Sequence, residues 1–272
     1  CSRTCNRKRG RGPGSCPRHR HPLHHRSTMS IATRSRAHAG APVIGAPLAG
    51  RAIPQSRPIE VFDDFYTLPK GSSAYTGGWF ESDSGGGSIL LQDLAGGVVR
   101  LRLTGGAGQE DSQEGLASPG EFFSFDSGKE AYFEVHVNVN TNGLTGRALW
   151  LGMTEGFAQG NNNTTILAPL AHMGFSILGA DLSFSHAGST VVTTDLGVNL
   201  VADTDYVLAC HYNGDGAYLV YVNGELKLRE QTGGTAHPDA LMRIFLSAEN
   251  PSDSTSGNGD MLIDCVYFCA EG

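Results

Sequence analysis

The sequence predicts an all-β fold, an antiparallel β-sandwich, and three observations lead to this prediction. The 272-residue chain holds 37 glycines and only 17% charged residues, a composition that suits many strands joined by tight turns. Several short runs alternate apolar with polar residues, as expected of strands with one face on a core. Gly, Asn, Asp and Ser separate these runs at spacings of about 8–12 residues, the pattern of sandwiches and barrels.

The clearest strand is the run AYFEVHVNVN at 131–140. Its odd-numbered residues from Phe133 to Val139 would face a core, while Glu134 and His136 would face water. No stretch shows a sustained helical period. The other expected strands are 96–106, 147–153, 174–178, 182–186, 206–212, 217–222, 225–230, 242–248 and 261–268.

Two Asn-Gly clusters lie in HYNGDGAYLVYVNGEL, residues 211–226. Asn223-Gly224 stands between two alternating runs, which predicts a two-residue type I′ hairpin, because both residue types tolerate positive φ. Asn213–Gly216 is predicted to be a longer turn. Asp215 is its one carboxylate, whereas calcium takes about 6–8 oxygen ligands. Backbone geometry therefore explains both clusters without a metal.

The charge is divided very unevenly along the chain. Residues 1–58 hold 12 of the 20 Lys and Arg residues and no acidic residue. Residues 59–272 hold 8 basic against 27 acidic residues, a net charge of −19. Composition predicts a basic Cys/His-rich segment at 1–28, an extended Ala/Gly/Pro/Arg arm at 29–58, and the sandwich domain at 59–272. The acidic domain itself is not expected to bind nucleic acid.

Residues 1–28 contain Cys1, Cys5, Cys16 and four of the ten histidines. The three cysteines form no C-x₂-C pair, which argues against a zinc knuckle. An alternative interpretation is that synthesis starts at Met29 and that residues 1–28 are not native. The segment lacks the apolar core of about 7–15 residues that a secretory signal needs. No apolar run reaches the roughly 18–20 residues of a membrane helix, so no membrane contact is expected.

The remaining cysteines are Cys210, Cys265 and Cys269. Cys265 and Cys269 lie on one expected strand with Cα atoms about 13 Å apart, beyond the ~7 Å limit for a disulfide. Cys210 would pair with one of them only if its strand were adjacent. Three cysteines in a domain of this size favour buried thiols and folding in a reducing cytoplasm.

Five strand motifs follow one another along the chain: GGVVRLRL (96–103), FEVHV (133–137), LGMTE (151–155), YLVYVNG (218–224) and the final CAEG (269–272). Taken in order, these motifs resemble the concanavalin A-like, laminin G-like jelly roll. Within this superfamily they are most similar to jelly-roll structural proteins of tailed bacteriophages. The resemblance covers about residues 60–272, and it implies a concanavalin A/laminin G-like sandwich carrying an extended basic N-terminal arm.

The resemblance implies a non-enzymatic virion protein that decorates the outer capsid surface of a tailed phage. Its partner would be the major capsid protein, and it would assemble in the host cytoplasm as a homo-oligomer. The arm would order on the capsid, since disordered arms can cover large surfaces. The arginines expected to contact the capsid are Arg34, Arg36, Arg51 and Arg57.

A carbohydrate-binding module of a phage tail or fibre is the alternative, with a cell-surface glycan as its ligand. Tyr75 and Trp79, in YTGGWF, are the candidate glycan platform, and a core position for Trp79 is the competing interpretation. No cofactor is required, although laminin G-like domains can bind calcium at loop edges. The candidate calcium ligands are Asp253, Asn258 and Asp260, and a solvated loop without metal is the competing interpretation.

A glycan-active enzyme is the more distant alternative. Glycoside hydrolases of this superfamily carry an E-x-D-x-E motif on one strand. The nearest match is Glu130–Glu134, with Tyr132 in place of Asp. The Cα atoms of these glutamates would lie about 13 Å apart, whereas glycoside hydrolysis needs carboxyls about 5–9.5 Å apart. A strand histidine such as His136 is expected to be a solvated face residue. We therefore predict no enzymatic activity.

Overall fold

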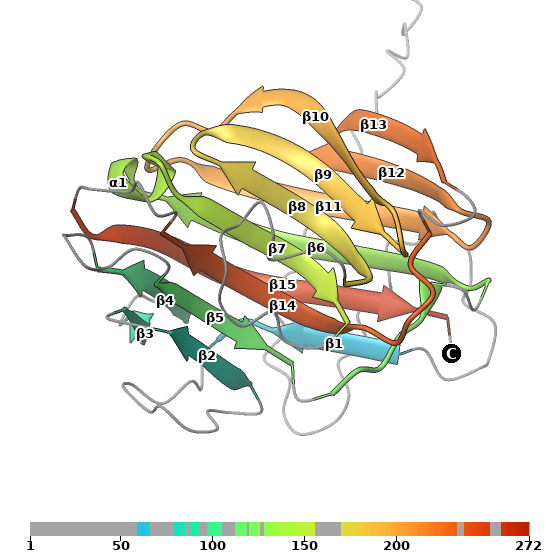
Figure 1. Cartoon of the computed structure of the whole chain (residues 1–272), viewed down its shortest axis with the longest axis horizontal. Coiled ribbons are helices and arrows are strands. Elements are labelled where there is room, and N and C mark those ends of the chain that lie inside the picture. Colours follow the sequence, from blue (N-terminus) through green and yellow to red (C-terminus); the bar gives the residue numbers. More distant parts are fainter. Residues whose placement is uncertain are drawn as a thin grey trace, which may run out of the picture. The chain divides into compact units, whose positions relative to one another are not determined.

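The computed structural model describes part of the domain that follows the basic arm. Its described residues form strands in two antiparallel sheets, with one short helix (Figure 1). The predicted all-β antiparallel sandwich is therefore confirmed. The segments 1–28 and 29–58 lie outside the described residues. The described residues are 59–65, 79–84, 87–92, 97–104, 112–118, 120–125, 128–155, 170–232, 237–250 and 257–271.

One sheet has eight strands: β1 (Ile59–Asp63), β3 (Ser88–Gln92), β4 (Val98–Leu103), β6 (Glu130–Val139), β11 (Asp205–Asn213), β12 (Ala217–Val222), β13 (Glu225–Gln231) and β15 (Gly259–Ala270). Their order is β13-β12-β11-β6-β15-β4-β3. On the side of β15 away from β6, β4 pairs with residues 259–263 and β1 with residues 266–270. The centre of the sheet is thus the antiparallel pair β6 and β15.

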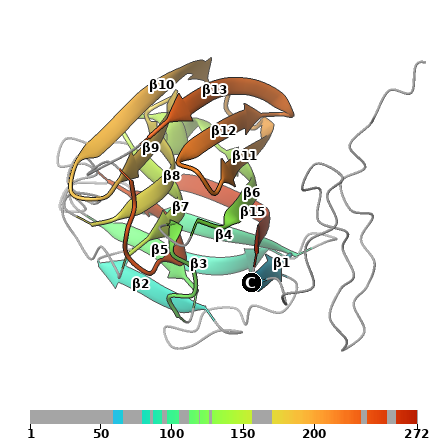
Figure 2. The same ribbon diagram turned by 90° about the vertical axis from the view of Figure 1, so that its right-hand side faces the viewer.

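The other sheet has seven strands: β2 (Phe80–Ser84), β5 (Gln113–Ala117), β7 (Ala148–Thr154), β8 (His172–Leu178), β9 (Asp181–Ala187), β10 (Val191–Asn199) and β14 (Arg243–Glu249). Their order is β10-β9-β8-β7-β14-β5-β2. Figure 2 shows the two sheets as two layers. The helix α1 (Thr141–Leu144) follows β6, and the side chain of Asn140 caps it by accepting a 2.7 Å hydrogen bond from the Gly143 amide.

The hydrophobic core lies between the two sheets. Along β6, Phe133, Val135 and Val137 are buried while the residues between them are half-buried, which confirms the alternation expected from the sequence. Leu151 and Phe175 of the seven-stranded sheet belong to the same core. Each such buried side chain contributes roughly 1.5–3 kcal/mol to stability. The alternation leaves the even-numbered side chains of β6 on the outer face of the eight-stranded sheet.

The two predicted turns form as expected. Asn223 and Gly224 have φ values of 51° and 79°, the positive values that a type I′ hairpin requires at both positions. In the preceding turn, Asn213 Oδ1 accepts hydrogen bonds of 2.9 Å from the amides of Asp215 and Ala217. Turn geometry therefore accounts for both Asn-Gly clusters.

Five of the fifteen strands in the described residues were not expected from the sequence: β1, β2, β3, β5 and β10. Four of them have only five residues, and β2 reads FESDS, which carries no apolar alternation. In β5, the polar Gln113 and Glu114 are fully buried because the strand lies between β14 and β2. Pairing with neighbouring strands, rather than local pattern, makes these segments strands.

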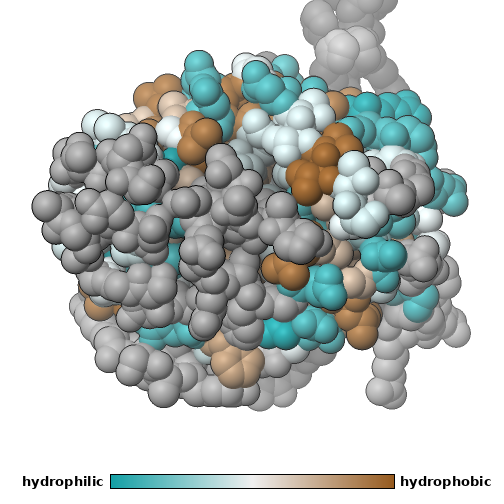
Figure 3. All heavy atoms as spheres, in the orientation of Figure 1, coloured by the Kyte–Doolittle hydropathy of each residue, from teal (hydrophilic) through white to brown (hydrophobic). Residues whose placement is uncertain are grey.

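Exposed apolar side chains are scattered over the described surface. On the face shown in Figure 3, hydrophobic residues form small separate patches among hydrophilic ones, which is ordinary for a globular protein. No helix in the described ranges is long and apolar enough to cross a membrane. The large exposed apolar residues are Phe62, Leu178, Val191, Val201, Leu226 and Leu241.

Trp150 packs over two glycines on the outer face of the seven-stranded sheet. Gly152 of β7 and Gly174 of β8 are cross-strand partners. A Cβ atom at Gly152 would lie 2.6 Å from Gly174 Cα and 2.9 Å from Trp150 Cζ2, and it would also collide with the Met173 carbonyl. The missing side chains make room for the indole ring, which is fully buried.

Gly152→Ala should therefore destabilise the protein by about 1–3 kcal/mol, the usual cost of overpacking. Two of the three atoms that meet the new methyl group are backbone atoms, so side-chain rotation cannot relieve the contact. Gly120→Ala is the control, because no atom lies within 4 Å of a Cβ at that position. Urea unfolding of the full chain measures both. Equal midpoints for the two variants would contradict the packing described.

Candidate functional site on the outer face of the eight-stranded sheet

The outward side chains of β6 form a connected polar row. The Tyr132 hydroxyl donates to Glu134 Oε2, and His136 Nε2 lies 2.9 Å from Glu134 Oε1. One step further, Asn138 Nδ2 donates to Asp205 Oδ1 of β11 at 2.8 Å. The four β6 residues of the row are two apart in sequence, and side chains at that spacing share one face of a strand. They are Tyr132, Glu134, His136 and Asn138.

The environment fixes the protonation of this row. Burial would raise the pKa of Glu134, but the hydrogen bonds from His136 and Tyr132 outweigh it and lower that pKa below its ordinary value of 4.5. Burial, together with the nearby Glu134 carboxylate, raises the pKa of Tyr132 far above its usual range. Glu134 is therefore an ionised acceptor and Tyr132 a neutral donor. Because a carboxylate only accepts hydrogen bonds, His136 Nε2 carries the proton that it shares with Glu134.

A β-bulge in β15 brings further polar groups to the same face. Opposite β6, Ile263 pairs with Val137 and Cys265 pairs with His136, so Asp264 is an extra residue in β15. A bulge places two residues opposite one and re-aims the side chains around it. Asp264 and Cys265, although consecutive, are both half-buried beside His136. The Asp264 carboxylate lies 4.0 Å from His136 Nδ1.

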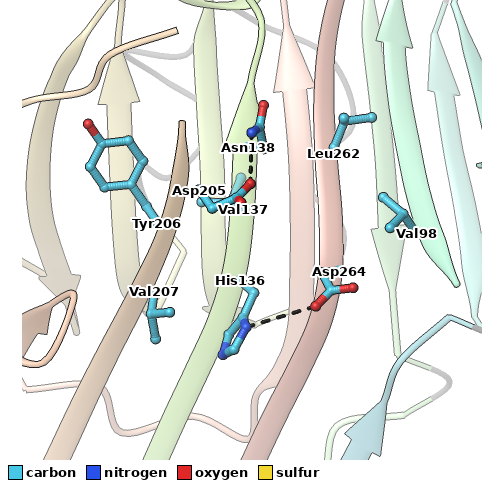
Figure 4. A pocket seen from close by; sticks show the side chains of 9 residues that line it. All are labelled: Val98, His136, Val137, Asn138, Asp205, Tyr206, Val207, Leu262 and Asp264. Atoms are coloured by element: carbon cyan, nitrogen blue, oxygen red, sulfur yellow. Dashed lines mark hydrogen bonds and ion pairs between the residues drawn. The ribbon is translucent and has the colours of Figure 1, made fainter. Parts of the chain in front are cut away.

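A pocket of about 470 Å³ opens beside this row. In Figure 4 the Asn138–Asp205 pair lies at one end, the His136–Asp264 pair at the other, and Val98, Val207 and Leu262 flank them. The pocket thus combines polar groups with an aliphatic surface. Its lining residues are Val98, His136, Val137, Asn138, Asp205, Tyr206, Val207, Leu262 and Asp264.

The predicted glycan platform lies elsewhere. Trp79 is only 4% exposed, its ring packs 5.6 Å from that of Phe65, and its Nε1–H donates to Asp63 Oδ2 at 2.6 Å. The structure therefore places Trp79 in the core, which was the competing interpretation, and its ring presents no open face to a sugar. Tyr75 lies outside the described residues.

The predicted calcium ligands are not brought together in the described part of the loop. Asp260 is held by Arg102, with Nε–Oδ1 and Nη2–Oδ2 distances of 2.6 and 2.7 Å. That bidentate pair occupies both carboxylate oxygens, so Asp260 is committed to an ion pair. Asn258 is exposed, and Asp253 lies outside the described residues. The arm arginines also lie outside them: Arg34, Arg36, Arg51 and Arg57.

Four residues of this face were not among the site residues predicted from the sequence: Glu134, His136, Asp264 and Cys265. His136 was expected to be a solvated face residue; it is half-buried and bonded to Glu134. The alternation of FEVHVN did show that Glu134, His136 and Asn138 share a face. No local signal marks the bulge at Asp264, because a bulge is defined by the partner strand.

None of the described cysteines forms a disulfide with another. Cys210 is buried on β11, and β6 lies between β11 and β15. Cys210 is therefore not on a strand adjacent to Cys265 and Cys269. Burial raises the pKa of the Cys210 and Cys269 thiols.

Known proteins resemble this chain in fold but not in sequence. No family pattern matches the sequence, and no curated protein matches it. A solved protein of unknown function from Shewanella oneidensis MR-1 has a TM-score of 0.54 at 14% identity, covering 87% of this chain and 97% of its own. An endo-β-1,4-glucuronan lyase from Trichoderma reesei has a TM-score of 0.54 at 11% identity, covering 71% and 91%.

A third similar structure is a GH16 protein of Bacteroides ovatus, solved with a mixed-linkage glucan product. Its TM-score is 0.53 at 11% identity, and the match covers 76% of this chain and 99% of that one. Together with the two-sheet architecture, these neighbours confirm the concanavalin A-like jelly roll. The phage origin, the capsid partner, homo-oligomerisation and virion localisation are not addressed by them and stay predictions.

The prediction that the chain is not an enzyme is corrected by these neighbours. The same sandwich serves a glucuronan lyase and a GH16 protein, so the fold is one that glycan-active enzymes use. The Cα separation of Glu130 and Glu134 does not exclude activity, because side chains two and four residues apart on a strand point the same way. In the structure Glu134 Oε1 faces His136 Nε2, and Glu130 Oε2 lies 3.6 Å from His211 Nε2. Two carboxyls from other strands, those of Asp205 and Asp264, lie on this face as well.

Replacing Glu134 by glutamine should make the free energy of unfolding less dependent on pH. A carboxyl whose pKa is lowered by folding stabilises the folded state above its ordinary pKa of 4.5, and that contribution is lost as the pH falls through the lowered value. We expect Glu134→Gln to be about 1 kcal/mol less stable than the parent at pH 7, with the difference shrinking below pH ~4.

Urea unfolding at several pH values measures this difference. Glu225→Gln, at a side chain that is 72% exposed, is the control and should be nearly silent throughout. A Glu134→Gln difference that stayed constant from pH 7 to strongly acid solution would show that the ionised carboxylate is not what stabilises the row.

Proposed function

We propose that this protein binds a glycan in the pocket on the outer face of the eight-stranded sheet. The observation that carries the proposal is the composition of that pocket. Asn138, Asp205 and Asp264 offer hydrogen-bonding groups to hydroxyls, while Val207 and Leu262 offer an aliphatic surface to the C–H faces of a sugar ring. Binding sites typically combine such an apolar lining with a few placed polar groups.

The fold gives independent support. Two proteins with the same type of sandwich act on or bind glycans, a glucuronan lyase and a GH16 protein bound to a glucan product. At 11% identity this likeness concerns the fold, and the binding site is defined by the residues of this chain.

The charge of the pocket favours a neutral glycan. Asp205 and Asp264 line it, and residues 59–272 carry a net charge of −19. Like charges brought together at a binding surface oppose association. A neutral β-glucan should therefore bind in preference to a polyuronate.

Binding of a mixed-linkage β-glucan tetrasaccharide, measured by titration calorimetry, tests the proposal. Asp205→Ala removes a hydrogen-bond partner and should weaken binding about 10- to 100-fold, since loss of a bond to a charged group costs roughly 1.5–3 kcal/mol. Asp181→Ala is the matched control, because Asp181 is likewise exposed and begins a strand, but in the other sheet. Its affinity should equal that of the parent.

Two results would reject the glycan site. One is the absence of binding to any neutral glucan at millimolar concentration. The other is an affinity that Asp205→Ala leaves unchanged. Stronger binding of polyglucuronate than of the neutral glucan would overturn the charge argument.

A second candidate function is cleavage of a glucan chain that extends from the pocket along the outer face, because the two carboxyls concerned, Glu60 and Glu134, are not among the pocket-lining residues. Glu60 of β1 and Tyr132 of β6 pair with Cys269 from its two sides, so Glu60 shares the outer face with Glu134. Burial raises the pKa of Glu60 above its ordinary value, a shift that the hydrogen bond from Tyr267 opposes, whereas the pKa of Glu134 is lowered. Carboxyls with pKa values displaced in opposite directions suit general acid and base roles.

Release of reducing ends from mixed-linkage β-glucan tests this second function. Glu60→Gln removes the proposed general acid and should lower the cleavage rate about 100-fold or more, while binding of the tetrasaccharide persists. Glu121→Gln, at a carboxyl that pairs with Arg243 of the other sheet, is the control. Cleavage at the parental rate by Glu60→Gln, or no cleavage by the parent, would exclude this role for Glu60.

A further inference from the structure

Three metal-ligating side chains converge at the bulge of β15. The imidazole of His136, the carboxylate of Asp264 and the thiol of Cys265 each offer one donor atom, and these atoms all lie within 4.8 Å of one another. The bulge creates this convergence, because on a regular strand Asp264 and Cys265 would point to opposite faces.

The donor distances are close to those of a zinc site. With bonds of about 2.0–2.3 Å in a tetrahedron, ligand atoms lie roughly 3.3–3.7 Å apart. His136 Nδ1 and Asp264 Oδ2 are already 4.0 Å apart. The three donor atoms lie within 4.8 Å of one another, so side-chain rotations that move each donor atom by about 1 Å would bring them to bonding positions around one ion.

His136 is oriented as a metal-binding histidine usually is. Its Nε2–H faces the Glu134 carboxylate at 2.9 Å, and Tyr132 holds the other carboxylate oxygen. With the proton on Nε2, the lone pair of Nδ1 points toward Asp264. Metal-binding histidines commonly donate their second ring N–H to a carboxylate in this manner, which fixes the tautomer and increases ligand basicity.

We propose that His136, Asp264 and Cys265 form a binding site for a divalent transition metal, and that zinc fits it best. A thiolate, an imidazole and a carboxylate are ligands that zinc accepts together, whereas calcium and magnesium require oxygen ligands. Glu134 is a positioning residue that acts through His136. His136 and Asp264 both line the pocket, so the fourth position of the ion faces an open space where water or a ligand hydroxyl can bind. The site does not depend on glycan binding.

Cobalt titration of the purified full chain tests the proposal. Every protein in the test carries Cys1→Ser, Cys5→Ser and Cys16→Ser, so that metal held by the N-terminal cysteines is not counted. This background protein should bind one equivalent of Co²⁺ and develop a thiolate-to-cobalt charge-transfer band, and Zn²⁺ should displace the cobalt. Cys265→Ser should abolish the band.

Cys269→Ser is the matched control. Cys269 lies four residues further along the same strand, is buried, and is not among the three ligands. The charge-transfer band and the Co²⁺ affinity of the Cys269→Ser variant should equal those of the background protein. Glu134→Gln should weaken Co²⁺ binding about 10–100-fold while the band remains, as expected of an outer-shell partner. His136→Gln should weaken it by more than Glu134→Gln does.

The proposal is overturned if the background protein binds no Co²⁺, or if the charge-transfer band survives Cys265→Ser. Should Cys265→Ser not fold, His136→Gln and Asp264→Asn decide, since unchanged Co²⁺ affinity in both would exclude the site. All these measurements are made without glycan, so their failure is distinct from failure of the glycan proposal.

Discussion

The β-bulge at Asp264 is the constraint on which both the core and the outer-face site depend. Side chains of a strand alternate with a period of two, so a regular strand keeps one set of residues inward over its whole length. In the twelve-residue β15 the buried core set changes from Met261 and Ile263 to Val266 and Phe268. One extra residue in the strand makes that change possible without turning apolar groups outward.

The same bulge joins the site to the centre of the sheet. β15 and β6 are neighbours along almost their full length, so residues of β15 meet the polar row of β6 on a rigid support. Within the row, the two oxygens of Glu134 are used by Tyr132 and His136. Polar networks whose members satisfy one another hold their geometry, and sites built on strands are more precise than sites built on loops.

In this fold, function is determined by the residues on the outer face of a sheet and not by the sandwich architecture itself. Proteins of the same fold include a lyase and a GH16 protein, and one framework can host many activities. Here the pocket places two carboxylates, an imidazole and an amide next to aliphatic side chains. A cation held by His136, Asp264 and Cys265 would offset the negative charge at one end of that pocket, which links the proposed metal site to the proposed glycan site through electrostatics.

The sequence by itself determined the all-β class, the two Asn-Gly turns and the inward face of β6, because alternation and turn preference are local properties of the chain. Only the tertiary structure decided the pairing of β15 with β6, the burial of Trp79 and the bulge at Asp264. The strand pairing and the bulge depend on segments more than a hundred residues apart in the sequence, whereas Trp79 packs against Phe65 and donates to Asp63. The residues of a strand determine its alternation of apolar and polar side chains. The position of a bulge, where that alternation changes face, depends on the pairing with the neighbouring strand.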